Sequence, residues 1–134
     1  MLIENARRRS SHAVNAAVVG LFLVAGVLGC GRGGGKTCTG ELSRAGRTFT
    51  GEAKTESEAK LFACNKYCRD VDPEYDAMYR IWLESPQGQK AGRPSKEQAI
   101  FEDKRLLDYV TITCANRCVK QAEAGTGKMT VSCR

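Results

Sequence analysis

The sequence predicts an α+β fold in which a small three-stranded antiparallel sheet packs on a layer of disulfide-stapled helices. Three observations lead to this fold class. Short segments at both ends of the domain alternate apolar and polar residues, as strands do. The long stretch between them carries apolar residues at helical spacing, and its cysteines are spaced to join two helices. The predicted order of elements is β-β-α-α-α-β.

The strands are predicted at the two ends of this domain. Residues 37–42 and 47–53 alternate between apolar and polar positions, and the segment 43–46 between them has the composition of a turn. This pattern predicts a β-hairpin. Residues 129–133 alternate in the same way and predict the third strand.

Helix starts are marked by residues that can cap a helix or occupy its first turn. The three starts are Thr55-Glu56-Ser57-Glu58, Asp72-Pro73 and Ser95-Lys96-Glu97-Gln98. We expect the third helix to run to about Ala122. The segment 85–94 contains two prolines and two glycines and is predicted to be a polar loop.

Cysteine spacing predicts the covalent framework. Apart from Cys30, the chain has an even number of cysteines, which suits disulfides in an exported domain. Two pairs have i, i+4 spacing, so each pair lies on one face of a helix. In antiparallel helices, the first cysteine of one pair lies beside the second cysteine of the other. The expected bonds are therefore Cys64–Cys118, Cys68–Cys114 and, between the ends of the domain, Cys38–Cys133.

This paired C-x-x-x-C arrangement resembles the disulfide-stapled helical hairpins of plant hairpin peptides and of small mitochondrial import chaperones. The resemblance covers only those four cysteines and implies bond geometry, not function. Two other uses of the cysteines stay open, namely a four-cysteine zinc site and a redox-active pair. Zinc ligands commonly come as C-x-x-C, and an oxidising compartment disfavours free thiolates, so we expect structural disulfides and no metal.

The first thirty residues have the layout of an export signal. Arg7, Arg8 and Arg9 precede a mostly apolar run, residues 13–28, which stops at Gly29-Cys30. The end of that run, Val27-Leu28-Gly29-Cys30, resembles the lipobox of bacterial lipoproteins. The resemblance implies that Cys30 is acylated, with chains such as palmitate, and becomes the mature N-terminus.

Three parts of the chain follow from this interpretation. They are a signal peptide at 1–29, a lipidated cysteine with a glycine-rich tether at 30–36, and a single disulfide-braced domain at 37–134. We expect an exported protein anchored by lipid to the cell membrane or outer membrane. An uncleaved N-terminal membrane anchor and a soluble secreted product are the alternatives.

Composition narrows the class of function. The only histidine, His12, lies in the predicted signal, so the domain lacks the side chain most used for acid–base chemistry near neutral pH. The excess of 21 Lys and Arg over 15 Asp and Glu is mild, and no run concentrates it. The glycine-rich segment 29–36 imitates a phosphate-binding loop, but an alternating stretch follows it where a helix is needed. We expect no enzyme, no cofactor, no nucleotide and no nucleic acid.

Two segments are candidate partner surfaces. Tyr75, Tyr79 and Trp82 form an aromatic stripe on the second helix, which is either core or, where a ring stays exposed, an anchor for a partner. Lys90 and Arg93 belong to the polar loop, which is either a connector or a second contact region. The sequence thus predicts a non-catalytic binding or structural module of the cell envelope for a protein, glycan or lipid. An envelope thiol–disulfide oxidoreductase or other small enzyme is the alternative.

Overall fold

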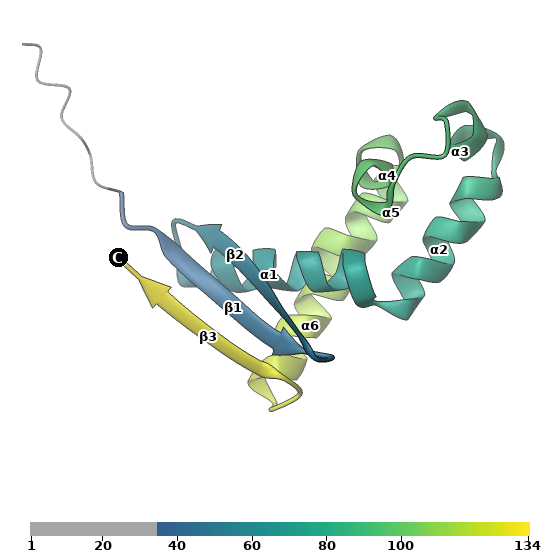
Figure 1. The fold of residues 1–134 in the computed structure, drawn as a ribbon. Helices are drawn as coiled ribbons and strands as arrows, with labels where there is room; N and C mark the ends of the chain where they lie inside the picture. Colours follow the sequence, from purple (N-terminus) through teal and green to yellow (C-terminus); the bar gives the residue numbers. More distant parts are fainter. Residues whose placement is uncertain (1–34) are drawn as a thin grey trace, which may run out of the picture. The chain divides into compact units, whose positions relative to one another are not determined.

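The structure, a computed structural model, describes residues 35–134; the predicted signal peptide and Cys30 lie outside these residues. Within them, three strands form an antiparallel sheet in the order β2-β1-β3, and most of the remaining chain is helical (Figure 1). The strands are β1 (Cys38–Arg44), β2 (Arg47–Ala53) and β3 (Lys128–Cys133). The predicted α+β class and its small antiparallel sheet are confirmed.

The hairpin turn between β1 and β2 is shorter than predicted. Ala45 and Gly46 have φ angles of 53° and 71°, which match the two left-handed positions of a type I′ turn. This turn suits the twist of the flanking strands and leaves residues 43–44 free to pair with β2. The expectation that 43–46 forms the whole turn was therefore wrong by two residues.

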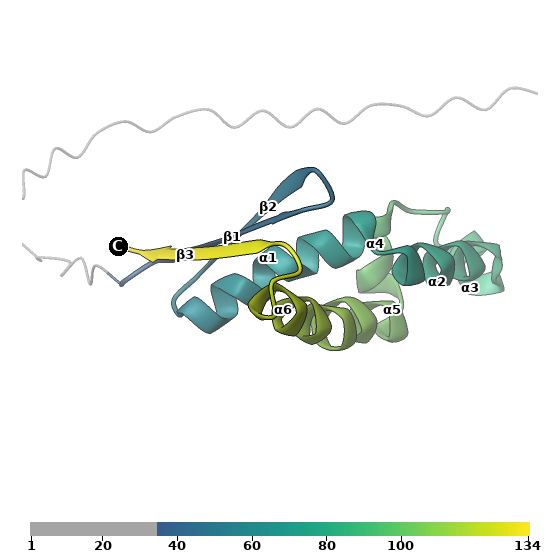
Figure 2. The same ribbon diagram turned by 90° about the horizontal axis from the view of Figure 1, so that it is seen from below.

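Helix α1 (Glu56–Val71) packs across one face of the sheet (Figure 2). The closest approach is at Gly40 and Gly51, which face each other in β1 and β2. A Cβ atom at Gly51 would lie 2.3 Å from the backbone nitrogen of Ala63, and one at Gly40 would lie 2.6 Å from the carbonyl oxygen of Ala59. The helix therefore lies against the sheet only because both strand positions lack a side chain.

The three predicted helix starts are confirmed. The Thr55 hydroxyl accepts a hydrogen bond from the backbone N–H of Glu58 at 3.3 Å and caps α1. The carboxylate of Asp72 accepts from two backbone N–H groups at the start of α2 (Pro73–Glu84). Ser95 forms a reciprocal capping box at the start of α4 (Lys96–Glu102).

Two predicted segments differ in the structure. The expected polar loop contains a short helix, α3 (Pro86–Lys90), which the Ser85 side chain caps. The expected long helix is interrupted at Asp103, whose φ and ψ of −136° and 117° are extended. Beyond Asp103 the chain continues as α5 (Lys104–Asp108), the π-helical turn η1 (Tyr109–Cys114) and α6 (Ala115–Glu123). The interruption arises because the Asp103 side chain bonds the following backbone and starts a new helix.

The three disulfides are Cys64–Cys118, Cys68–Cys114 and Cys38–Cys133, the pairs expected from the spacing. The first two join α1 to the η1–α6 segment, and the third joins β1 to β3. Thr37 and Arg134 exchange two backbone hydrogen bonds of 2.9 Å, so the neighbouring cysteines form a non-hydrogen-bonded pair, whose side chains lie closer. The sulfur atoms are bonded to one another and not arranged around zinc, and three disulfides indicate an oxidising, exported environment.

The disulfides differ in exposure, and this predicts their order of reduction. The four cysteines between the helices are buried, as is Cys38, whereas Cys133 is only half-buried. Thiolate attack requires access to a sulfur atom, so a mild thiol reductant should open Cys38–Cys133 first in the folded protein. The measurement is timed alkylation followed by peptide mass analysis. Earlier labelling of Cys64 or Cys118 would contradict the prediction.

Candidate functional site

The aromatic stripe lies mainly in the core. Tyr75 is fully buried, its hydroxyl donates to the carbonyl oxygen of Lys96 at 2.6 Å, and burial raises its pKa to about 12. Tyr79 is half-buried and its hydroxyl donates to the carbonyl oxygen of Pro94 at 2.8 Å. Trp82 is buried in the same cluster. Of the two alternatives left open for the stripe, Tyr75 and Trp82 thus belong to the core, and Tyr79 is the one ring of the three that is partly exposed.

The two basic residues of the predicted partner surface lie at the end of α3 and just after it. Lys90 is exposed in the last turn of α3. The Arg93 guanidinium pairs with the Glu84 carboxylate at 2.7 Å, and this hydrogen bond raises the pKa of Arg93. This ion pair thus links the segment that follows α3 to the last residue of α2. Arg93 therefore has a structural role. The Lys90 side chain has no hydrogen bond or ion pair among residues 35–134.

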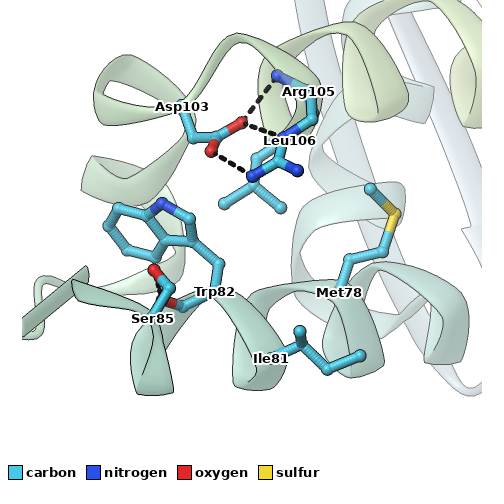
Figure 3. Close-up of a pocket in the computed structure, with 7 residues that line it drawn as sticks. All are labelled: Met78, Ile81, Trp82, Ser85, Asp103, Arg105 and Leu106. Atoms are coloured by element: carbon cyan, nitrogen blue, oxygen red, sulfur yellow. Dashed lines mark hydrogen bonds and ion pairs between the residues drawn. The ribbon is translucent and has the colours of Figure 1, made fainter. Parts of the chain in front are cut away.

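A pocket with a mainly apolar lining lies between α2 and α5, in the helical part beyond the sheet (Figure 1 and Figure 3). It has a volume of about 320 Å³, near the lower end of the roughly 300–1,000 Å³ typical of ligand pockets. In Figure 3, Trp82 lies on one side, Met78 on the other and Ile81 below, with the Asp103 and Arg105 side chains above. The lining residues are Met78, Ile81, Trp82, Ser85, Asp103, Arg105 and Leu106.

The polar wall of this pocket is an ion pair within one turn of chain. The Asp103 side chain is 5% exposed and accepts from the backbone N–H of Arg105 at 2.8 Å and from the guanidinium of Arg105 at 3.0 and 3.3 Å. These hydrogen bonds lower the pKa of Asp103 and raise that of Arg105. The Arg105 side chain itself is 80% exposed. The pocket thus has a buried carboxylate held ionised and a guanidinium open to solvent.

An unpaired donor is buried in the wall of the pocket, beneath its accessible surface. Trp82 is 3% exposed, and its indole Nε1 is the one buried side-chain nitrogen or oxygen of residues 35–134 that has no hydrogen-bond partner. Figure 3 shows this nitrogen on the edge of the ring that faces Asp103. Leaving a buried donor unpaired costs roughly 1–3 kcal/mol.

The Asp103 carboxylate predicts a loss of stability in acid. Since the folded pKa of Asp103 is lowered, its contribution is present above the unfolded value of about 3.9 and is lost as pH falls through the folded value. Asp103→Asn keeps a capping oxygen but does not titrate. Denaturant unfolding between about pH 5 and pH 2 should show a steeper loss for the wild type than for this variant. Equal slopes would contradict the prediction.

A second polar cluster ties the α1–α2 junction to η1 and α6. The Tyr109 hydroxyl lies 2.8 Å from the Asp72 carboxylate and 2.9 Å from that of Glu74, and Arg117 bonds all three side chains at 2.7–3.1 Å. The hydrogen bonds from Arg117 and Tyr109 lower the pKa of Glu74, and burial raises that of Tyr109. Neither group is adjusted to exchange a proton near neutral pH. The cluster is a clamp between helices.

No protein-family model, curated protein or solved structure matches this chain. Within the described part of the chain, no three histidine, cysteine, aspartate or glutamate side chains are placed to hold a metal ion. Along residues 35–134, no helix has the length and apolar character needed to cross a bilayer.

The pocket could not be predicted from the sequence, because its wall forms where Asp103 interrupts a helix. The apolar pattern is helical on both sides of Asp103 and does not indicate this interruption. Asp103 and Arg105 fall in what the sequence predicts as one long helix, and neither was singled out. The available signal was local: an aspartate followed two residues later by an arginine suits a cap that also pairs with its own helix. The structure alone shows that Ile81, next to Trp82 in the sequence, is 75% exposed.

Proposed function

We propose that this chain is an exported, lipid-anchored, non-catalytic binding module of the bacterial cell envelope, whose binding site is the α2–α5 pocket. The observation that carries the proposal is the apolar hollow of about 320 Å³ that Met78, Ile81 and Leu106 help to line beside the Asp103–Arg105 ion pair. Apolar pockets with a few polar groups are the usual form of small-ligand sites.

The charges around the pocket favour binding over acid–base catalysis. Hydrogen bonds to Arg105 lower the pKa of Asp103, which keeps it a carboxylate at neutral pH. Arg105 stays protonated because the same contacts raise its pKa. A general acid or base works best with a pKa near the ambient pH. The pKa of Asp103 is instead lowered and that of Arg105 raised, so both are farther from neutral pH.

The anchor is supported by two independent features. The segment before Cys30 resembles a lipobox signal, and the domain behind it is held by three disulfides, which form in exported proteins. Intact-mass analysis of protein purified from membranes tests the anchor. We expect the purified protein to lack residues 1–29 and to have acyl chains on Cys30. In a Cys30→Ser variant, we expect neither the cleavage nor the acylation. Retention of residues 1–29 without acylation would contradict lipid anchoring.

Trp82 also provides the test of the binding site, because it is the only tryptophan. Titration with 1-octanol should shift its fluorescence, since the alkyl chain would lie against the indole ring. Ile81→Ser should weaken this binding, whereas Ile112→Ser, at a 57% exposed position outside the pocket lining, should not. No spectral change at saturating octanol, or equal loss in both variants, would contradict a site in this pocket.

The alternative function, an envelope thiol–disulfide oxidoreductase, is favoured by one observation. Cys133 is half-buried, whereas the other five disulfide-bonded cysteines are buried. Rapid, reversible reduction of Cys38–Cys133 with transfer to a second disulfide protein would support this alternative. Slow reduction that accompanies unfolding would exclude it.

A further inference from the structure

We propose that the free edge of β3 is a dimerisation surface, at which β3 pairs antiparallel with β3 of a second copy of this chain. The sheet has the order β2-β1-β3, so only one side of the β3 backbone is paired. Figure 1 shows β3, in yellow, as the outermost strand on its side of the sheet. An open strand edge is a template for pairing with another chain. No residue of β3 lines the α2–α5 pocket, so the two proposals can fail separately.

The free backbone groups of β3 follow from its pairing with β1. Thr37 and Arg134 exchange two backbone hydrogen bonds next to the Cys38–Cys133 pair. In an antiparallel ladder, pairs that bond each other alternate with pairs that do not. Every second residue of β3 therefore directs its N–H and C=O away from β1, and these groups have no partner among residues 35–134. The three residues are Met129, Val131 and Cys133.

These free groups are arranged symmetrically about Val131, so a second copy offers the groups that the first one needs. We consider the antiparallel register that places Val131 opposite Val131 of the second copy. In this register Met129 lies opposite Cys133 of the second copy, and Cys133 lies opposite Met129 of that copy. Every free N–H and C=O of both strands is then paired. This self-complementarity is what a two-fold symmetric contact requires.

The side chains of β3 suit the same register. Met129 and Val131 are half-buried, and Met129 packs against the core on the face that α1 covers. Pairing would bring these apolar side chains of both copies together and remove more of their surface from water. On the opposite face, Thr130 would lie across from Ser132 of the second copy. Both are exposed, and their hydroxyl groups can hydrogen-bond across the strands.

The β3 edge lacks the features that block pairing, whereas the β2 edge has them. Natural edge strands are protected by charges, prolines and bulges. Residues 129–132 contain no charge and no proline, and their register with β1 is unbroken. Strand β2 instead carries Arg47 and Glu52, and α1 lies against it so closely that Phe62 contacts Gly51. Two copies joined at β2 would crowd their α1 helices against each other.

Sedimentation of the whole protein, purified from membranes in detergent, tests the proposal over a range of concentrations. We expect a reversible dimer with a dissociation constant in the micromolar range, because one strand pair is a small interface. In the monomer, the amides of Met129, Val131 and Cys133 should exchange with solvent quickly, whereas those of Thr130 and Ser132 bond to β1. Hydrogen exchange of the first three should slow as the protein concentration rises. A monomer at about 1 mM, or a dimer in which these three amides still exchange quickly, overturns the proposal.

Proline substitutions at the two sheet edges provide a matched comparison. Val131→Pro removes an N–H that points away from β1, so the bonds between β3 and β1 remain. It should weaken dimerisation about tenfold or more, since a hydrogen bond of each copy is lost and the proline ring obstructs the second strand. Thr50→Pro is the control, because the same alternation directs its N–H to the outer edge of β2. Equal dimerisation of the two variants overturns the proposal.

Two surface variants test the register without removing a backbone hydrogen bond, and they decide the question if a proline variant does not fold. Thr130→Lys/Ser132→Glu places opposite charges across the proposed interface, whereas Thr130→Lys/Ser132→Lys places like charges there. Each contact occurs twice about the two-fold axis. The first variant should therefore dimerise about tenfold or more tightly than the second, and salt should reduce the difference. Equal dimerisation of both variants at low salt overturns the pairing of β3 with its own copy.

Discussion

Replacing Cys64, Cys68, Cys114 and Cys118 together by alanine is expected to lower the free energy of unfolding by about 7 kcal/mol. The two bonds are nested, with sequence separations of 54 and 46 residues. When one of these bonds is present, the other closes only a small ring, which consists of residues 64–68 and 114–118. Each bond alone is therefore expected to contribute about 2–3 kcal/mol, whereas the loss of both opens a long loop.

The expected result is that the joint loss exceeds the sum of the separate losses. Because small domains have a stability of about 5–15 kcal/mol, this loss is a large fraction of the total, and the quadruple variant should unfold at a much lower denaturant concentration than either pair variant. The Cys64→Ala/Cys118→Ala and Cys68→Ala/Cys114→Ala variants serve as controls and should remain folded. Circular dichroism and denaturant unfolding of the three proteins provide the measurement. A quadruple variant no less stable than the sum of the two pairs would contradict the nested arrangement.

The Gly51→Ala substitution is expected to lower the free energy of unfolding by about 3 kcal/mol or more, the upper part of the range for overpacking. The added methyl group would lie 2.3 Å from the backbone nitrogen of Ala63 and 2.6 Å from the backbone of Phe62. These are backbone atoms of α1, so no side chain can rotate away. The helix must shift from the sheet and lose contacts along its buried face.

The control for this substitution is Gly35→Ala, because it adds the same methyl group where nothing lies within 4 Å. It should change the stability by less than about 0.5 kcal/mol. Urea unfolding of both variants, with unchanged slope, gives the comparison. If Gly51→Ala were as stable as the control, the close contact of α1 with β2 would be wrong.

Several parts of this molecule follow from short-range sequence signals. The caps at Thr55, Asp72 and Ser95 were predictable because a capping side chain bonds backbone groups two or three residues away. The helix–helix disulfides were predictable because i, i+4 spacing places both cysteines on one face. The paired strands were predictable from alternation. None of these signals depends on what the rest of the chain does.

Other features were not predictable because they depend on contacts between distant segments. The periodicity of residues 95–122 is helical on both sides of Asp103, so the pattern conceals the break that creates α4 and α5. The short helix α3 forms where Gly88 lies against the backbone of α2, a contact that composition alone does not reveal. Whether the aromatic stripe is core or surface is likewise decided by packing.

The sequence by itself determined the fold class, the helix starts, the cysteine spacing and the resemblance of residues 1–30 to a lipoprotein signal. Only the tertiary structure decided that Tyr75 and Trp82 are buried, that α1 contacts the sheet at two glycines, and that Trp82 and Arg105 border one pocket. The physical reason is range. Caps, turns and i, i+4 pairs are set by neighbouring residues, whereas burial, close approach and an unpaired donor depend on which distant side chains fill the surrounding space.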